Sequence, residues 1–291
     1  GEMNIELFQQ ENLEKLPLFD LPVDFVVYDK IDGNLLKFYR GYPCKIDACI
    51  FAYLMKGNAK AQVNLWDFDI HEHDLVAIIP GSFIEINEVS DDIKVAIVGL
   101  SSSFLKTANQ WNILLPMFNK PVMCPNDDLA SIYSEMFACL SHAASFNFPV
   151  LSNSVMIEVL KGLLLAFNDN LKTGILTSRN TADTSSHESK IASEFLQLAF
   201  ENYREEHKIS FYAHQINLTL SHFCSVINRA LGKTPQEIIK NMIIMDAQTQ
   251  LKGSDSSVTS IATSLGFPTA TAFNRYFRTY TGMTPLDYRN S

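Results

Sequence analysis

Short apolar runs separated by turn residues occupy the first third of the chain. The runs lie at residues 25–28, 35–39, 46–55, 60–68, 75–79, 83–89 and 93–100. Turn-forming pairs such as Gly57-Asn58 and Pro80-Gly81 lie between them. Many short strands with closely spaced turns are typical of a β-sandwich or a small barrel, and they argue against alternating strands and helices.

The apolar spacing changes to a helical period after Asp127. Apolar residues recur every three or four positions up to Leu140, and the pattern resumes after Pro149 and continues to Phe167. We therefore expect two successive helices. Their apolar surface exceeds what is needed to cover a barrel, which favours a helix-mediated contact between two copies of the chain. Packing on their own barrel is the alternative.

The segment 172–190 differs in composition from its surroundings. Its sequence, KTGILTSRNTADTSSHESK, is rich in Ser, Thr, Asn and Asp and poor in large apolar residues. Such a composition is typical of a flexible linker. The sequence therefore predicts one domain at residues 1–171, a flexible linker at 172–190 and a second domain at 191–291.

The second domain has a helical pattern throughout and contains an internal repeat. Gly232-Lys233-Thr234-Pro235 recurs 50 residues later as Gly282-Met283-Thr284-Pro285. Each repeat predicts a short helix, a tight connection and a second helix, which is the helix-turn-helix pattern. The predicted helices are 210–217 and 219–231 in the first repeat and 257–265 and 269–280 in the second.

A longer helix is predicted between the repeats. Thr234-Pro235-Gln236-Glu237 combines a Thr cap, a Pro at the first helical position and a Glu that can return a hydrogen bond to the cap. This helix is expected to run from Pro235 to about Leu251.

The second helix of each repeat has an apolar and a polar face. Phe223 and Phe273 belong to the apolar face, and each has an apolar residue four positions later. The polar face presents Ser221, His222, Ser225, Asn228 and Arg229 in the first repeat and Thr271, Asn274, Arg275 and Arg278 in the second. An α-helix fits the major groove of DNA, where such side chains hydrogen-bond to base edges and phosphates. We predict that these residues bind DNA.

Composition and charge are compatible with this interpretation. The chain has 291 residues, of which 47% are hydrophobic and 19% charged, enough apolar material for two packed domains. Residues 1–187 carry 13 Lys and Arg against 23 Asp and Glu, whereas residues 209–291 carry 7 against 4. That excess permits contact with a polyanion but is smaller than in many DNA-binding domains. With no long uncharged apolar stretch and no secretory leader, we expect a cytoplasmic protein without membrane contact.

Three segments of the second domain together carry a family signature. They are SIATSLGF at 260–267, FNRYFR at 273–278 and GMTPLDYR at 282–289. The region from Ile209 to Arg289 thereby resembles the C-terminal domain of AraC-type (AraC/XylS) transcription regulators. The resemblance implies a seven-helix domain with two helix-turn-helix motifs. In many members a cupin-like β-barrel that senses a small molecule, and helices that dimerise, precede this domain.

The resemblance also assigns base-reading positions. They fall on Ser221, Cys224 and Ser225 in the first recognition helix and on Ala270, Thr271, Asn274 and Arg275 in the second. The chain departs from the pattern at Ser225, where Arg is usual, and at Asn228, where Lys is usual. Met242 and Ile243 replace a common basic residue in the connecting helix. These departures imply weaker readout by the first repeat.

Other candidate chemistry is less supported. His71-Glu72-His73 places two histidines on one face of a strand, as in metal-binding cupins, but no further His follows until His142. We interpret this segment as the turn before Asp74 and expect no metal ion and no cofactor. Because phosphate loops, nucleophile elbows and HExxH motifs are absent, we do not expect an enzyme.

The sequence thus predicts an α+β chain of two domains. The first is a cupin-like β-barrel with accessory helices, and the second is an all-α domain with two helix-turn-helix motifs. We expect a homodimeric transcription regulator that binds promoter DNA, responds to a small-molecule effector and contacts RNA polymerase. One alternative is a cupin-type small-molecule-binding protein or enzyme whose C-terminal helices mediate only protein contacts. Another is a regulator whose barrel serves only as a dimerisation scaffold.

Overall fold

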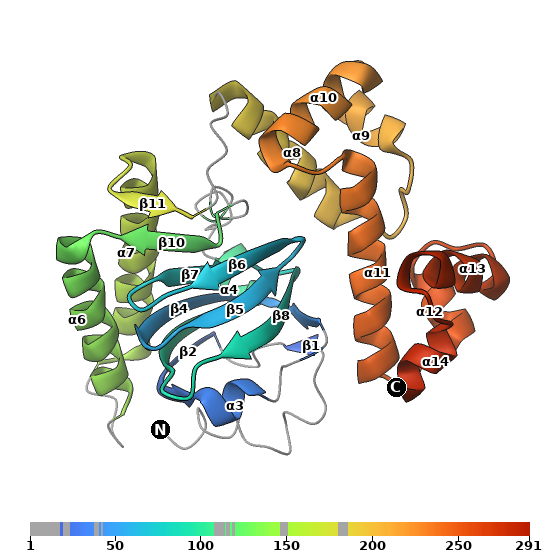
Figure 1. The fold of residues 1–291 in the computed structure, drawn as a ribbon. Coiled ribbons are helices and arrows are strands. Elements are labelled where there is room, and N and C mark those ends of the chain that lie inside the picture. The colour runs from blue at the N-terminus through green and yellow to red at the C-terminus, as the bar shows by residue number, and fades with distance from the viewer. Residues whose placement is uncertain are drawn as a thin grey trace. The chain divides into compact units, whose positions relative to one another are not determined.

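The computed structural model divides the chain into two compact units, residues 1–180 and residues 181–291. The structure describes residues 18–19, 24–37, 41, 43–107, 114, 117, 120–145, 151–179 and 186–291. Strands, two short helices and two long helices make up the described part of the first unit, and the described part of the second unit is helical (Figure 1). The predicted α+β class with two domains is confirmed.

Two sheets form the body of the first unit. The five-stranded sheet has the order β1 (Leu18–Phe19), β3 (Cys44–Ile46), β8 (Ser82–Val89), β5 (Ala59–Val63) and β6 (Trp66–Ile70). The six-stranded sheet has the order β11 (Leu176–Ser178), β10 (Val122–Pro125), β7 (Leu75–Ile78), β4 (Ala48–Lys56), β9 (Lys94–Ser101) and β2 (Phe25–Asp32). The pairing is antiparallel except between β1 and β3.

The two sheets share one hydrophobic core. Val63 and Phe68 of the five-stranded sheet pack with Val76 and Ile97 of the six-stranded sheet in the same buried cluster. A cupin-like β-barrel was expected, but the described strands form two sheets that do not close into a barrel. Because each sheet buries one face against the other, the apolar pattern is satisfied without closure.

Both faces of the six-stranded sheet are covered. In β4, Ala52 and Leu54 belong to the core between the sheets. Their neighbours Phe51 and Tyr53 contact helices instead, with ring centroids 4.8 Å from Phe167 and 5.5 Å from Phe137, respectively. A strand buried on both faces needs apolar residues at every position. This explains the continuous apolar run of β4.

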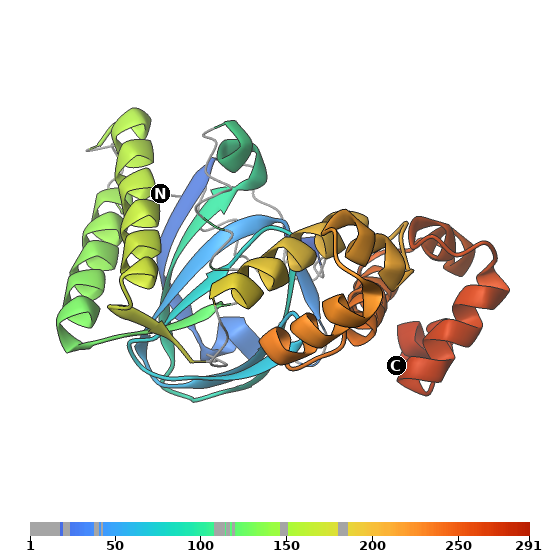
Figure 2. The same ribbon diagram turned by 90° about the horizontal axis from the view of Figure 1, so that it is seen from above.

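The helices in the described part of the first unit are α3 (Gly33–Lys37), α4 (Ser102–Thr107), α6 (Asp127–Ala144) and α7 (Asn153–Lys172). The two long helices α6 and α7, predicted from the apolar period, lie side by side (Figures 1 and 2). The side-chain amide of Asn170 in α7 donates to the hydroxyl of Tyr133 in α6 at 2.8 Å. Both helices pack on their own sheet with one face, yet large apolar side chains remain exposed on the other, namely Ile132, Val155, Val159 and Leu165.

Two strand predictions are wrong. The run at 60–68 is two strands, because Asn64 adopts a φ of 54° in a tight hairpin and its side chain accepts a 2.9 Å hydrogen bond from the backbone of Phe83. The run at 35–39 overlaps α3, where the carboxylate of Asp32 accepts a hydrogen bond from the backbone of Asn34. Residues 38–40 lie outside the described residues.

The segment 172–190, expected to be a flexible linker, carries regular structure in its described parts. Lys172 ends α7, β11 pairs with β10, and α8 begins at Ser186. The guanidinium of Arg179 donates two hydrogen bonds of 2.8 Å to Asp74. Pairing of a short polar strand with a partner far away in the sequence outweighs the composition that predicted a linker.

Seven helices make up the described part of the second unit, as the resemblance implied. They are α8 (Ser186–Asn202), α9 (Ile209–Gln215), α10 (Leu220–Leu231), α11 (Pro235–Gly253), α12 (Val258–Ser264), α13 (Ala270–Thr281) and α14 (Pro285–Asn290). The capping box predicted at Thr234 and Glu237 starts α11. None of the helices in the described part of the chain is long and apolar enough to cross a membrane.

Candidate nucleic-acid interface

The two predicted repeats share local structure at both ends of their second helices. Thr219 caps α10 and Thr269 caps α13, each accepting a hydrogen bond from a backbone amide three residues later. Gly232 and Gly282 end these helices with φ of 68° and 81°, in the left-handed region that glycine adopts without strain. The internal repeat is therefore also a structural repeat.

The apolar faces of both helices are buried as predicted. Phe223 and Ile227 of α10 and Phe273 and Phe277 of α13 have no exposed surface. The ring of Phe223 stands edge-on to Phe195 of α8 at 5.1 Å between centroids. Burying a Phe or Ile side chain contributes about 1.5–3 kcal/mol, so the orientation of each helix about its own axis is firmly fixed.

The polar faces of both helices are exposed. The structure exposes all the residues predicted to bind DNA: Ser221, His222, Ser225, Asn228, Arg229, Thr271, Asn274, Arg275 and Arg278. Of the additional positions implied by the resemblance, Cys224 and Ala270 are partly buried. Each second helix thus offers one polar face to solvent.

A hollow lies over the polar face of α13. Thr271, Asn274, Arg275 and Arg278 line it. Thr279 and Thr284 also line the hollow, although the sequence did not single them out as binding residues. Thr284 caps α14. It belongs to the repeated motif Gly282-Met283-Thr284-Pro285, which is the feature of the sequence that could have identified it.

The two polar faces differ in charge. On α13, the guanidinium groups of Arg275 and Arg278 have no hydrogen-bonding or ionic partner among the described residues. On α10, the guanidinium of Arg229 donates to Oε1 of Glu188 at 2.7 and 3.1 Å and to the hydroxyl of Ser225 at 2.8 Å. Sequence reasoning missed Glu188, which lies 41 residues before Arg229.

The connecting helix α11 is buried on most sides. Met242 and Ile243, which replace a basic residue common in the family, are each 1% exposed. Their side chains are part of the packed interior of the second unit. The helix contacts α10 at one end and α12, α13 and α14 at the other (Figure 1).

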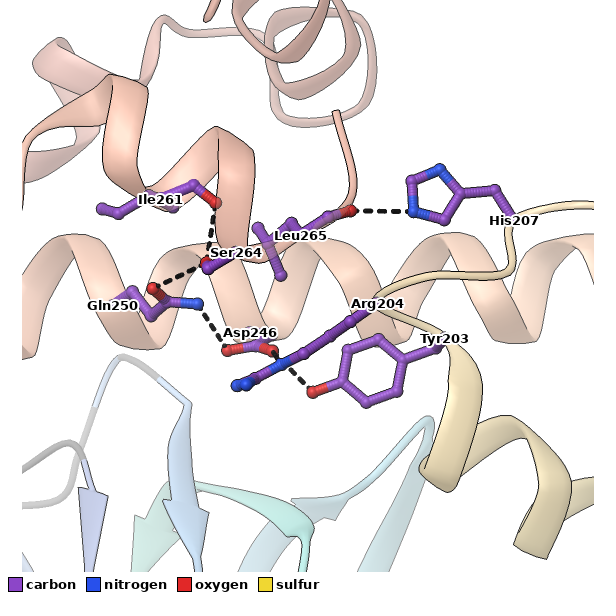
Figure 3. A network of polar contacts seen from close by, with 8 residues as sticks. All are labelled: Tyr203, Arg204, His207, Asp246, Gln250, Ile261, Ser264 and Leu265. Carbon is purple, nitrogen blue, oxygen red and sulfur yellow. Dashed lines mark hydrogen bonds and ion pairs between the residues drawn. The ribbon is translucent and has the colours of Figure 1, made fainter. Parts of the chain in front are cut away.

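One carboxylate inside the unit joins the turn that follows α8 to α11. Asp246 is 1% exposed and accepts hydrogen bonds from the hydroxyl of Tyr203 at 2.5 Å and from Nε of Arg204 at 2.7 Å (Figure 3). Burial and the nearby charge of Asp246 raise the pKa of Tyr203 well above its usual value, so the hydroxyl stays protonated and able to donate.

The same network extends to the second helix-turn-helix (Figure 3). Gln250 donates to Asp246 at 3.1 Å and accepts from the hydroxyl of Ser264 on α12 at 3.1 Å. Nε2 of His207 lies 2.8 Å from the carbonyl oxygen of Leu265. The chain after α8 is thus held to the turn of the second motif.

Gly266 is required in that turn. Its φ is 77°, and a Cβ atom at this position would lie 2.1 Å from the carbonyl oxygen of Arg204. Both turns contain a residue type that tolerates left-handed backbone angles. The first turn has its left-handed residue at Asn217, with a φ of 58°.

The histidines considered as metal ligands lie in a turn, as predicted. His73 adopts a φ of 70°, and its Nδ1 lies 3.0 Å from the hydroxyl of Tyr53. The backbone amide of His71 donates to the carboxylate of Asp74. Within the described ranges no three His, Cys, Asp or Glu side chains are grouped as they would be around a metal ion.

Comparison with known domain families matches part of the second unit. Residues 212–291 match the model of a helix-turn-helix domain family of the AraC/XylS type. The C-terminal domain is an AraC-type domain. The resemblance inferred from the sequence is thereby confirmed.

Relatives of the chain include two bacterial operon regulators. The raffinose operon transcriptional regulatory protein RafR of Pediococcus pentosaceus is 30% identical over 141 residues, which cover 48% of this chain and 50% of the relative. The chain thus matches about half of that protein's length. The Msm operon regulatory protein of Streptococcus mutans is 21% identical over 278 residues, 93% of either chain. The solved structure of ToxT from Vibrio cholerae has a TM-score of 0.45 at 16% identity, covering 92% of this chain and 98% of ToxT.

Proposed function

We propose that this chain is a sequence-specific DNA-binding transcription regulator in which α10 and α13 enter the major groove. The observation that carries the proposal is that both repeated helices expose their polar faces while Phe223 and Phe273 anchor the opposite faces. Asn274 and Arg275 are proposed to read bases, and Arg278 to bind phosphate. The AraC-type assignment of residues 212–291 supports these roles.

The test begins with selection of a bound site from random duplex DNA by the full-length protein. Binding of the selected duplex is then titrated at several salt concentrations. Each phosphate contact contributes about −0.9 to the slope of log K against log salt, so a reader with several contacts loses affinity steeply. Lack of salt-dependent duplex binding would favour the alternative, in which the C-terminal helices mediate only protein contacts.

Within this proposal the second repeat contributes more to specificity than the first. Arg275 is a free guanidinium on the groove face, whereas Ser225 replaces the usual Arg. A good base contact by Arg is worth about 1–3 kcal/mol, so Arg275→Ala should weaken binding about 5- to 150-fold. Ser225→Ala should weaken it less than about threefold. Equal losses in a mobility-shift titration at fixed salt would contradict this ranking.

The first unit is proposed to be a cupin-like sensor of a small molecule. Two facing sheets around one core are the arrangement of double-sheet jelly rolls, which include the cupins. Raffinose is the first probe because RafR is a raffinose operon regulator. Both tryptophans, Trp66 and Trp111, lie in residues 1–180, so tryptophan fluorescence of the full chain follows melting of this unit. A ligand at 100 times its Kd should stabilise the unit by about 2.7 kcal/mol. No shift across a panel of sugars and other metabolites would favour the scaffold alternative.

The homodimer is proposed to form through α6 and α7. The exposed side chains of Ile132, Val155, Val159 and Leu165 give these helices an apolar outer surface. Val159→Glu should increase the monomer fraction in sedimentation at micromolar concentration, whereas Ser154→Glu, the same charge at an exposed polar position, should not. Transcription in vitro from the selected site with purified RNA polymerase then separates activation from repression.

A further inference from the structure

The single arginine of the first recognition helix, α10, is bound by other side chains of the protein. Arg229 is the only Lys or Arg in α10, and its guanidinium makes three hydrogen bonds, two to Glu188 and one to Ser225. The side chain of Glu188 is 21% exposed and that of Arg229 is 54% exposed. Glu188 therefore neutralises the charge that α10 would otherwise present on its polar face.

The matching helix of the second repeat has no such pair among the described residues. Arg275 and Arg278 lie exposed on α13. The two helices share caps, buried aromatic residues and terminal glycines, so their local structures are alike. They differ in the number of arginine side chains that are free to bind an anion. The difference originates in α8, which contacts α10 and supplies Glu188 in its first turn.

We propose that Glu188 limits the DNA affinity of the first recognition helix by competing with backbone phosphate for Arg229. This inference rests on the proposed DNA binding. A phosphate can bind the guanidinium in the same two-point fashion as a carboxylate, so both anions compete for one site. The third bond of Arg229 also holds the hydroxyl of Ser225, a base-reading position by resemblance. Release of Arg229 therefore frees Ser225 as well.

The strength of the pair sets the size of the effect. Exposed ion pairs typically contribute an amount equivalent to about a 1.5- to 5-fold change in an equilibrium constant. That contribution is large enough to measure in a binding titration. Removal of the Glu188 charge should therefore tighten duplex binding about two- to fivefold at roughly 0.1 M salt.

The experiment compares Glu188→Gln with wild type and with Glu194→Gln in the full-length protein. Glu194 is exposed on the same helix, so its variant makes the same change in net charge. We expect Glu188→Gln to tighten binding of the selected duplex and to steepen the salt slope by about 0.9, the value for one additional phosphate contact. Glu194→Gln should leave both quantities within error of wild type. Thermal unfolding followed by circular dichroism verifies that each variant is folded.

Arg229→Gln identifies the group through which Glu188 acts. In the wild-type background this substitution should weaken binding less than about twofold, since Arg229 is already neutralised. In the Glu188→Gln background it should abolish the gain and restore the wild-type slope. A gain that persists without Arg229, or one matched by Glu194→Gln, would overturn the inference, as would weaker binding by Glu188→Gln. If wild type itself shows no salt-dependent duplex binding, the proposed function fails instead.

Discussion

Replacement of Gly266 by alanine should destabilise the second unit far more than the same replacement of Gly282. Both glycines have a positive φ, 77° at Gly266 and 81° at Gly282. An L-residue in the left-handed region costs about 1–2 kcal/mol, and this cost applies to both positions. At Gly282 no atom lies within 4 Å of the added Cβ, so the backbone cost is the whole effect.

At Gly266 the added Cβ would also overlap the backbone. It would lie 2.1 Å from the carbonyl oxygen of Arg204, and the two segments would have to separate by more than about 1 Å to reach an ordinary contact. Overpacking of this kind typically costs about 1–3 kcal/mol. Separation would also weaken the 2.8 Å contact between His207 and Leu265, worth about another 1 kcal/mol. The expected total for Gly266→Ala is about 3–6 kcal/mol.

Urea unfolding of the full chain measures the difference. Far-UV circular dichroism follows the helices, and tryptophan fluorescence follows residues 1–180, where both tryptophans lie. With a slope of about 2 kcal/mol per molar urea, Gly282→Ala should lower the midpoint of the helical transition by about 0.5–1 M and Gly266→Ala by about 1.5–3 M. The fluorescence midpoint should not move. Equal shifts for the two variants would refute the close approach of Arg204 to Gly266.

Three further predictions use the same two probes. Asp246→Asn should destabilise the second unit by about 2–3 kcal/mol, because it leaves Arg204 without its carboxylate, and circular dichroism should detect a shift that tryptophan fluorescence does not. Asp74→Asn should cost the first unit a similar amount of about 2–3 kcal/mol, because the amide lacks the charge that pairs with Arg179 and has only one oxygen to accept its two bonds, and here the fluorescence midpoint should fall. Burial raises the pKa of Tyr203 and Tyr276, so these residues contribute stability that is complete below a pH of about 10, where unfolded tyrosine titrates, and is lost as the pH rises further. A stability of the second unit that stays constant from pH 9 to pH 11.5 would contradict the last expectation.

The helices of the second unit could be predicted closely because their signals are local. Thr219, Thr234 and Thr269 each cap a helix through a hydrogen bond three residues away, and the apolar period is fixed within a single helix. The predicted helix 219–231 is observed at 220–231 and the predicted helix 269–280 at 270–281. Local chemistry of this kind needs no knowledge of the tertiary fold.

The strands of the first unit were predicted less well because their signals depend on partners. Apolar and polar residues alternate from Ala61 to Leu65, past the end of β5 at Val63, so this alternation does not mark where β5 ends. The decisive contact comes from Phe83, 19 residues later. The polar segment around β11 became a strand for the same reason, since β10 supplies its partner.

The exposed polar faces of the candidate site could be predicted from the sequence. The ion pair that modifies one of them could not, because its two residues are far apart in the sequence. The exposed polar faces follow from spacing alone, since burial of Phe223 and Phe273 orients each helix. The pairing of Glu188 with Arg229 spans 41 residues and depends on how α8 packs on α10. Asp246 left a visible trace, a lone acid directly after Ile243, Ile244 and Met245, but its partners at Tyr203 and Arg204 follow only from the fold.

These features together explain why two helices with the same local structure, α10 and α13, are expected to differ in DNA affinity. The buried aromatic residues and terminal glycines give α10 and α13 the same presentation, so any difference in DNA affinity between them must come from exposed side chains. On α13 two arginines are available, whereas on α10 the single arginine is bound by Glu188. The connecting helix α11 adds no positive charge at Met242 and Ile243, which are apolar and buried in the interior of the second unit. We therefore expect the second repeat to supply most of the phosphate attraction and the first repeat to be the place where affinity can be adjusted.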